Sequence, residues 1–189
     1  TIMDDAMPTQ WANVPLEREE LARDALVGLG LRENLTYHFT SLEREAMLTA
    51  RGAASSLVDE SRYVRIANPI APEKSVMRQS LLTNLLESAR ANLRYGDSQQ
   101  IFEIGTVFHR VEGQQLPDEP SRLGILINGA RETGYWGGTS GAGGDFYDMK
   151  GIIEGLMHGL HVGTVRYQAA NHPSLHPGRS AEVLVNGQK

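Results

Sequence analysis

The sequence contains no cysteine. This absence excludes disulfide bonds, a thiolate-ligated metal and a cysteine nucleophile, and it fits a reducing compartment. Long apolar runs are also missing, because no segment approaches the roughly 20 consecutive apolar residues that span a bilayer. The N-terminus lacks the basic and then apolar order of a signal peptide. We therefore expect a cytoplasmic protein that does not enter a membrane.

Positive charge is in deficit. Lysine and arginine together number 18, against 23 aspartates and glutamates, which gives a formal net charge of -5. This balance argues against nonspecific nucleic-acid binding by the whole surface, because phosphate neutralisation needs clustered cations. A local basic patch is still allowed.

The size and composition are those of an ordinary globular domain. Hydrophobic residues make up 40% of the 189 positions and charged residues 22%, which suffices for one domain with a core. Residues 1–16 carry two prolines and few apolar side chains, so we expect an extended lead-in from an upstream domain. Residues 17–189 are then the core domain.

The stretch from Asn68 to Arg110 combines an extended segment, a helix and a strand. Its prolines hold the entry extended, and Ser80 is the expected N-cap of the helix. An apolar row recurs every fourth residue, at Met77, Leu81, Leu85, Ala89 and Leu93, and is widened by Leu82 and Leu86. The following strand, 101–108, alternates an apolar face (Phe102, Ile104, Phe108) with one that carries Glu103, Gly105, Val107 and His109.

Upstream, the apolar spacing predicts a helix over 17–29 that Gly30 closes. Residues 34–40 alternate Leu35, Tyr37 and Phe39 with polar side chains, so we expect a strand whose apolar face is buried. A short helix capped by Ser41 should run to Ala50, and a strand is expected over 63–67.

Downstream, a strand is expected around Leu123, Ile125 and Ile127, followed by a mobile glycine-rich loop over 129–146. Asp145 or Tyr147 opens a helix whose buried row is Met149, Ile153, Leu156 and Leu160. Its glycines, at positions 151, 155 and 159, have the spacing of a face that another backbone approaches closely.

Two more strands are expected, over 165–169 and 181–185, and Asn186-Gly187 is a strong signal for a two-residue hairpin turn. Only two residues follow that turn, so we interpret the chain as a fragment that lacks its last strands. Strands with interspersed helices but no regular βαβ rhythm favour an α+β fold with a mainly antiparallel sheet.

Several patterns could support chemistry. The glycine-rich loop lacks the Walker spacing of a phosphate-binding loop, so a flexible loop is the better interpretation. His158 and His161, or His172 and His176, could be metal pairs, yet no carboxylate set completes either one. We therefore expect packing or hydrogen-bonding histidines.

Glu103 could form an acid–base pair with Asp145, Asp148 or Glu154, although nothing in the sequence fixes their separation. Ser174 stands beside His172 and His176 but lacks the context of a nucleophilic serine. Four arginines surround the central helix and strand and could bind a phosphate or carboxylate, or pair with Glu87 or Glu103; they are Arg78, Arg90, Arg94 and Arg110.

The central stretch carries a specific resemblance. NPIAPEKSVMRQSLLTNLLESARANL, followed by IFEIGTVF, closely resembles the core of bacterial phenylalanyl-tRNA synthetase (phenylalanine–tRNA ligase) beta subunits. Three further segments match in the same order: TYHFTS at 36–41, DFYDMKGIIEGL at 145–156 and HPSLHPGRSAEVLV at 172–185. The resemblance thus covers nearly the whole chain.

The resemblance implies a class II aminoacyl-tRNA synthetase-like fold, an antiparallel sheet flanked by helices. In this family two alpha and two beta subunits assemble; alpha activates phenylalanine with ATP and magnesium and charges the tRNA. The beta copy of the domain is noncatalytic and supports alpha. The editing region and RNA-binding module of beta subunits lie outside the matching segments.

One residue agrees with a noncatalytic role. A catalytic class II site has an arginine directly after the aromatic residue of its second motif, whereas His109 follows Phe108 here. Arg110 comes one position late, which in a strand means the opposite face. The glycine-rich third motif with its ATP-binding arginine is not identifiable.

The resemblance therefore implies a degenerate site face formed by Arg78, Glu103 and His109. We expect no catalytic, cofactor-binding or metal-binding residue in this chain, and the chain alone should be inactive. ATP, magnesium and tRNA would be bound by the holoenzyme. The alternative is a free-standing module that binds an amino acid or nucleotide on the same fold, with these three residues as its pocket.

Overall fold

A central three-stranded sheet organises the chain in the computed structural model, which describes residues 11–49, 58–96, 98–131, 143–172, 174–176 and 178–188. The strands are β1 (Arg32–Glu33), β4 (Gln99–Thr106) and β5 (Ser121–Asn128), in the order β1-β4-β5. β4 pairs antiparallel with β5 along its whole length, whereas the short β1 pairs parallel with β4. The expected antiparallel pairing therefore holds for β4 and β5 but not for β1.

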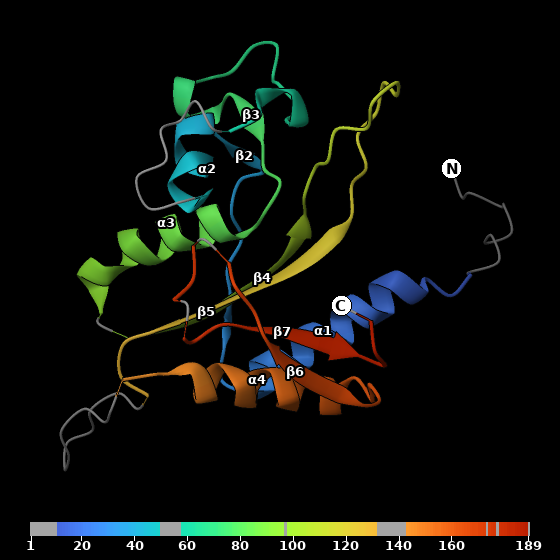
Figure 1. The fold of residues 1–189 in the computed structure, drawn as a ribbon, viewed down its shortest axis with the longest axis vertical. Coiled ribbons are helices and arrows are strands. Elements are labelled where there is room, and N and C mark those ends of the chain that lie inside the picture. The colour runs from blue at the N-terminus through green and yellow to red at the C-terminus, as the bar shows by residue number, and fades with distance from the viewer. Residues whose placement is uncertain are drawn as a thin grey trace, which may run out of the picture.

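Helices cover both faces of this sheet (Figure 1). α3 (Leu82–Asn92) packs on one face, where Leu81, Leu85 and Ala89 form a core with Ile101, Val107 and Leu126. α1 (Val14–Gly28) and α4 (Phe146–Gly159) pack on the other face, around Phe102, Leu26, Leu31 and Leu156. Successive strand residues point to opposite faces, so both Ile101 and Phe102 are buried.

The helix ends follow local signals. α1 begins at Val14, earlier than expected, because the Asn13 side chain accepts a hydrogen bond from the Leu16 amide at 3.3 Å and Pro15 is tolerated in the first turn. Gly30 closes it as predicted, with φ of +90°. Asp145 is the N-cap of α4, and its reciprocal hydrogen bonds with Asp148 form a capping box.

The predicted glycine face and the predicted buried row of α4 are each confirmed only in part. A Cβ on Gly155 would lie 2.8 Å from a Leu29 methyl, and one on Gly159 would lie 3.2 Å from the Ala25 Cβ, so these glycines do admit α1 closely. Gly151 meets nothing within 4 Å, so the prediction is wrong there. Of the predicted buried row, Leu156 and Leu160 pack in the core with α1, whereas Ile152 packs there in place of Met149 and Ile153.

Short elements form a second layer above the sheet in Figure 1: β2 (Phe39–Thr40) pairs with β3 (Val76–Met77), next to α2 (Leu42–Thr49) and three-residue 3-10 turns at 60–62 and 72–74. A third 3-10 turn, 93–95, follows α3. The predicted strand over 63–67 is reduced to one bridge between Arg65 and Val76. Ser41 caps α2 through the Arg44 amide, as expected; Ala50 lies outside the described residues.

Met77 does not belong to the helix row, contrary to expectation, because its amide donates to the Val64 carbonyl and keeps the backbone extended. The Ser80 hydroxyl accepts a hydrogen bond from the Leu82 amide at 3.1 Å, but the N-cap of α3 is Leu81, one residue later than expected. Leu86 and Leu93 are exposed rather than part of the buried stripe.

The chain ends in a two-stranded sheet of β6 (Val165–Ala169) and β7 (Ala181–Val185), as predicted. Asn186 and Gly187 have φ of 51° and 82°, and Val185 and Gln188 are hydrogen-bonded to each other across them, which confirms the hairpin turn. The glycine-rich loop prediction falls mostly on residues 132–142, which lie outside the described residues.

Candidate functional site

The residues predicted to form a site face meet inside the molecule. Arg78 is fully buried and Glu103 is 2% exposed, and the Arg78 Nη1 lies 2.7 Å from the Glu103 Oε1. The Arg78 Nε donates to the Thr106 carbonyl at 2.9 Å. The two side chains therefore pair with each other, although the buried Arg78 Nη2 has no hydrogen-bond partner among the described residues. A ligand cannot reach them without opening the core.

Thr36 closes this network. Its hydroxyl accepts a hydrogen bond from the Arg78 Nη1 at 2.8 Å and donates one to the Glu103 Oε2 at 2.7 Å. Its amide also donates to the Glu103 Oε1 at 3.4 Å. A buried ion pair is stable only when hydrogen bonds satisfy its remaining polar atoms, and Thr36 provides several of them.

This network reverses the predicted burial of residues 34–40, of which only Phe39 and Thr40 form a strand. Thr40 is 1% exposed, whereas Leu35 and Tyr37 are 81% and 69% exposed. Thr36 turns inward because Arg78 and Glu103 require polar partners there, whereas His38, on the same predicted face, is exposed. Two large apolar side chains are thereby left on the surface.

Gly105 makes room for the Arg78 guanidinium. A Cβ at this position would lie 2.5 Å from the Arg78 Nη2 and 3.2 Å from the Glu103 Oε1. The glycine in the predicted polar face of β4 thus serves the ion pair rather than a ligand.

His109 is separate from this network. β4 ends at Thr106, and the His109 backbone forms a two-way bridge with Asp118, with both N···O distances at 2.9 Å. The Phe108 ring packs on the His38 ring, with centroids 5.6 Å apart, and not with Phe102 and Ile104. The structure therefore brings Arg78 and Glu103 together. Among the described residues, the His109 side chain forms no hydrogen bond or ion pair with either of them.

The other candidate residues have structural partners. Asp148 pairs with Arg131, Glu154 with Lys150, and Glu87 with Arg44, so none of these carboxylates meets Glu103. His172 and His176 each accept a hydrogen bond from a backbone amide two residues on, which confirms the expectation of hydrogen-bonding histidines. Within the described ranges, no group of three or more histidine, aspartate or glutamate side chains is placed to hold a metal.

A second buried carboxylate was missed by the sequence reasoning. Glu45 is 5% exposed; it accepts hydrogen bonds from the Thr83 hydroxyl at 2.8 Å and from the Tyr63 hydroxyl at 3.3 Å. Burial raises the pKa of Glu45 above its usual range, and the nearby Glu87 adds to the rise. Burial and the adjacent Glu45 also raise the pKa of Tyr63. The sequence did carry a signal for this burial, because Glu45 lies on the same helical face as Leu42 and Ala46.

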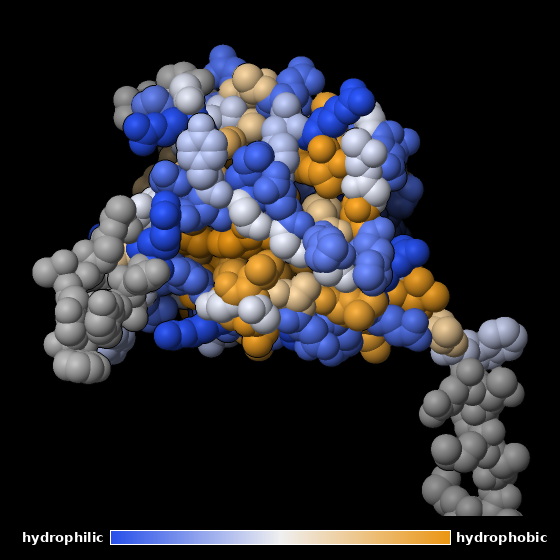
Figure 2. Space-filling view, turned by 90° about the horizontal axis from the view of Figure 1, so that it is seen from below, coloured by the Kyte–Doolittle hydropathy of each residue, from blue (hydrophilic) through white to orange (hydrophobic). Residues whose placement is uncertain are grey.

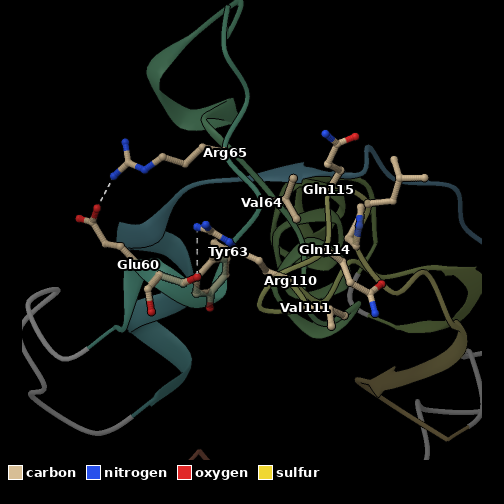
Figure 3. Close-up of a pocket in the computed structure, with 11 residues that line it drawn as sticks. Glu60, Tyr63, Val64, Arg65, Arg110, Val111, Gln114 and Gln115 are labelled. Atoms are coloured by element: carbon tan, nitrogen blue, oxygen red, sulfur yellow. Dashed lines mark hydrogen bonds and ion pairs between the residues drawn. The ribbon is translucent and has the colours of Figure 1, made fainter.

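Near Tyr63 the surface is hollowed into a groove of about 450 Å³ (Figure 3). One wall is the segment 60–65, and the other is the loop 110–117 that follows His109; we call this cavity the 60/110 groove. Arg110 reaches from the loop toward the Ser61 carbonyl, 3.5 Å away. The sequence grouped Arg110 with Arg78, Arg90 and Arg94; Arg78 is buried, whereas Arg110 is open to solvent.

Apolar side chains are exposed on a separate face. Figure 2 shows the underside of the molecule, where α1 and α4 lie and apolar side chains gather between polar ones. On α1, Leu16, Leu21 and Val27 are each at least half exposed. Among the described residues, no helix is long and apolar enough to cross a membrane.

Comparisons with known proteins, by family model and by sequence, point to the same protein family. Residues 3–189 match the family model described as "Phenylalanyl tRNA synthetase beta chain CLM domain". Phenylalanine–tRNA ligase beta subunits of Symbiobacterium thermophilum and Syntrophus aciditrophicus are each 38% identical to this chain, over 88% and 92% of its length. The beta subunit of Bacillus subtilis is 34% identical over 87% of it.

This chain spans about a fifth of these relatives, since the matches cover 18%, 22% and 20% of their lengths. Among solved structures, a pyrrolysyl-tRNA synthetase of Desulfitobacterium hafniense superimposes with a TM-score of 0.62 at 18% identity, covering 90% of this chain and 54% of that one. This likeness shows the fold alone, which is the class II synthetase-like fold that the resemblance implied. The chain belongs to the family of phenylalanyl-tRNA synthetase beta-chain CLM domains.

Proposed function

We propose that this domain is a noncatalytic copy of the synthetase catalytic fold, which acts by assembling with the alpha subunit. The observation that carries this proposal is the closed ion pair of Arg78 and Glu103, which fills the interior where the resemblance placed a site face. His109, in the position of the phosphate-clamping arginine, is engaged in a backbone bridge to Asp118. In this proposal Arg78, Glu103 and His109 are the remnants of a site without chemistry.

ATP and magnesium then belong to the alpha subunit, which attaches phenylalanine to its tRNA. We place the two subunits in a cytoplasmic assembly of two alpha and two beta chains, and tRNA is bound by that assembly. The Arg78 guanidinium and the Glu103 carboxylate are not accessible to a nucleotide, because each is buried against the other. The same observation disfavours a free-standing amino-acid or nucleotide-binding module at these residues.

Exposed apolar side chains support the assembly role. Leu35 and Tyr37 lie on the surface of the segment that delivers Thr36 to the ion pair. Further apolar residues are exposed along α1. Large exposed apolar patches are typical of protein interfaces. These side chains are therefore candidates for contact with the alpha subunit.

Phenylalanine-dependent exchange of pyrophosphate into ATP tests the proposal. The chain alone should show no exchange above a buffer blank, whereas its cognate alpha subunit should co-purify with it. The matched control is the complete enzyme, which must be active under the same conditions. Exchange by the chain alone, at a rate that tracks its concentration across independent preparations, would overturn the proposal.

A further inference from the structure

The walls of the 60/110 groove are fixed before any ligand binds. The 60–65 segment is hydrogen-bonded to β3 through the Val64 carbonyl, 2.9 Å from the Met77 amide. Tyr63, which is 7% exposed, is anchored by its hydroxyl to Glu45. The opposite loop is closed at its neck by the two hydrogen bonds between His109 and Asp118. Binding of a ligand would therefore require little ordering of these walls, which keeps the entropic cost of binding small.

Charge in the groove is positive although the chain is negative overall. Arg65 forms an ion pair with Glu60, so these two lining charges cancel. The Arg110 guanidinium has one long contact to the Ser61 carbonyl, and within the described part of the chain no carboxylate lies within ion-pair distance of it. Arginine binds carboxylates through paired N–H donors. The groove thus presents one cation that lacks an anion.

The remaining lining favours a peptide. Gln114 and Gln115 contribute amides that can hydrogen-bond an extended backbone, and Val64, Val111 and Leu116 contribute apolar contacts. Binding of RNA depends on several phosphate-neutralising cations and on exposed aromatic rings. Tyr63 is the aromatic side chain in this lining, and it is buried. The lining therefore fits an extended chain with an acidic side chain better than it fits a phosphate backbone.

We propose that the 60/110 groove binds an extended acidic peptide segment of a partner protein, with a carboxylate of that segment on Arg110. The site lies apart from the Arg78–Glu103 network and from the apolar residues of α1. Its test uses this chain without the alpha subunit, so its failure is distinct from failure of the assembly proposal.

The probe is a fluorescein-labelled octapeptide of alternating leucine and glutamate, compared by fluorescence anisotropy with the same peptide carrying glutamine. The glutamate peptide should bind at least about tenfold more tightly, because one charge-assisted contact is worth roughly that factor. Arg110→Gln should remove this preference. Val111→Asp, which leaves Arg110 in place and adds a repelling carboxylate to the wall, should weaken binding similarly. Arg166→Gln, on the exposed part of β6, is the matched control and should change nothing.

Four results would overturn the proposal. The two peptides could bind equally or not at all, or Arg110→Gln could leave the preference intact in a protein with the parent's melting temperature. An oligouridylate that displaces the glutamate peptide at a lower concentration than the unlabelled peptide does would assign the groove to phosphates. Retention of the preference in Val111→Asp would place the peptide elsewhere on the surface.

Discussion

The guanidinium of Arg78 and the carboxylate of Glu103 form an ion pair in the interior, 2.7 Å apart, although 25 positions separate them in sequence. Arg78 precedes α3 and Glu103 lies in the middle of β4, so the pair ties the start of a helix to the sheet on which that helix packs. Because both side chains are almost completely buried, removal of either partner leaves an isolated charge in a medium that solvates it poorly.

Arg78→Met should therefore destabilise the domain by about 3–5 kcal/mol, and Glu103→Leu by a similar amount. The double variant should lose clearly less than the sum of the two, because no uncompensated charge remains. Urea denaturation of all four proteins gives the coupling energy. Arg65→Gln, which breaks the exposed pair with Glu60, is the control and should cost no more than about 1 kcal/mol. Equal costs for Arg78→Met and Arg65→Gln would contradict the structural role of the buried pair.

Two glycines of α4 should respond in opposite ways to alanine. Gly151→Ala meets no neighbour within 4 Å, so it should stabilise the helix by about 0.5–1 kcal/mol through the better propensity of alanine. Gly155→Ala places a methyl 2.8 Å from Leu29 and should forfeit that gain or reverse it. Thermal unfolding measures both. If the two variants melt at the same temperature, α1 and α4 are not packed as closely as the structure indicates.

The elements that the sequence predicted correctly are governed by neighbouring residues. Asp145 caps α4 through an amide three positions away, and Asn186-Gly187 turns the chain by its own dihedral preferences. Gly155 and Gly159 were recognised because helical spacing places them on one face. Such features are set within a turn or two of the chain, so composition and spacing suffice to predict them.

The predictions that failed depend on distant residues. Thr36 is turned inward by Glu103 and Arg78, which lie 67 and 42 positions away. Apolar alternation in 34–40 predicted the reverse, because period alone cannot show which face meets a buried ion pair. Glu103 was correctly weighed as a partner for arginine, but the sequence could not choose between this pairing and an open site. His109 was assigned to the same face because β4 was expected to run to Phe108, whereas it ends at Thr106.

Stability should depend on pH through Glu45. Its folded-state pKa is raised above the ordinary value of 4.5, chiefly by burial, so the folded protein holds this proton more tightly than the unfolded chain does. That stabilisation is complete below the unfolded-state pKa and declines as pH rises toward the folded-state value. Glu45→Gln cannot ionise, so its stability relative to the parent should improve as pH increases from 4.5 to 7.

Thr83→Val tests the same dependence of stability on pH by removing a hydrogen-bond donor to Glu45. The Thr83 hydroxyl donates to Glu45 and lowers its pKa, so losing this donor should extend the decline of stability to higher pH. Urea midpoints collected at several pH values for the parent, Glu45→Gln and Thr83→Val give the comparison. A stability difference between Glu45→Gln and the parent that stays constant across this range would show that Glu45 titrates alike in the folded and unfolded chains.

The exposed apolar side chain of Leu35 provides the test of assembly at a single position. Leu35 is 81% exposed, so Leu35→Ser should leave the unfolding free energy of the chain nearly unchanged. If the side chain is buried against the alpha subunit, the same change should weaken co-purification, since burial of one leucine is worth about 1.5–3 kcal/mol, or roughly tenfold or more in affinity.

Met47→Ser is the matched control, because Met47 is 72% exposed on α2, away from the 34–38 segment. Equal loss of alpha subunit from both variants would indicate a general effect of surface polarity, and retention of alpha by Leu35→Ser would remove this segment from the interface. Loss confined to Leu35→Ser would explain why Leu35 and Tyr37 are exposed on a segment that turns Thr36 into the core.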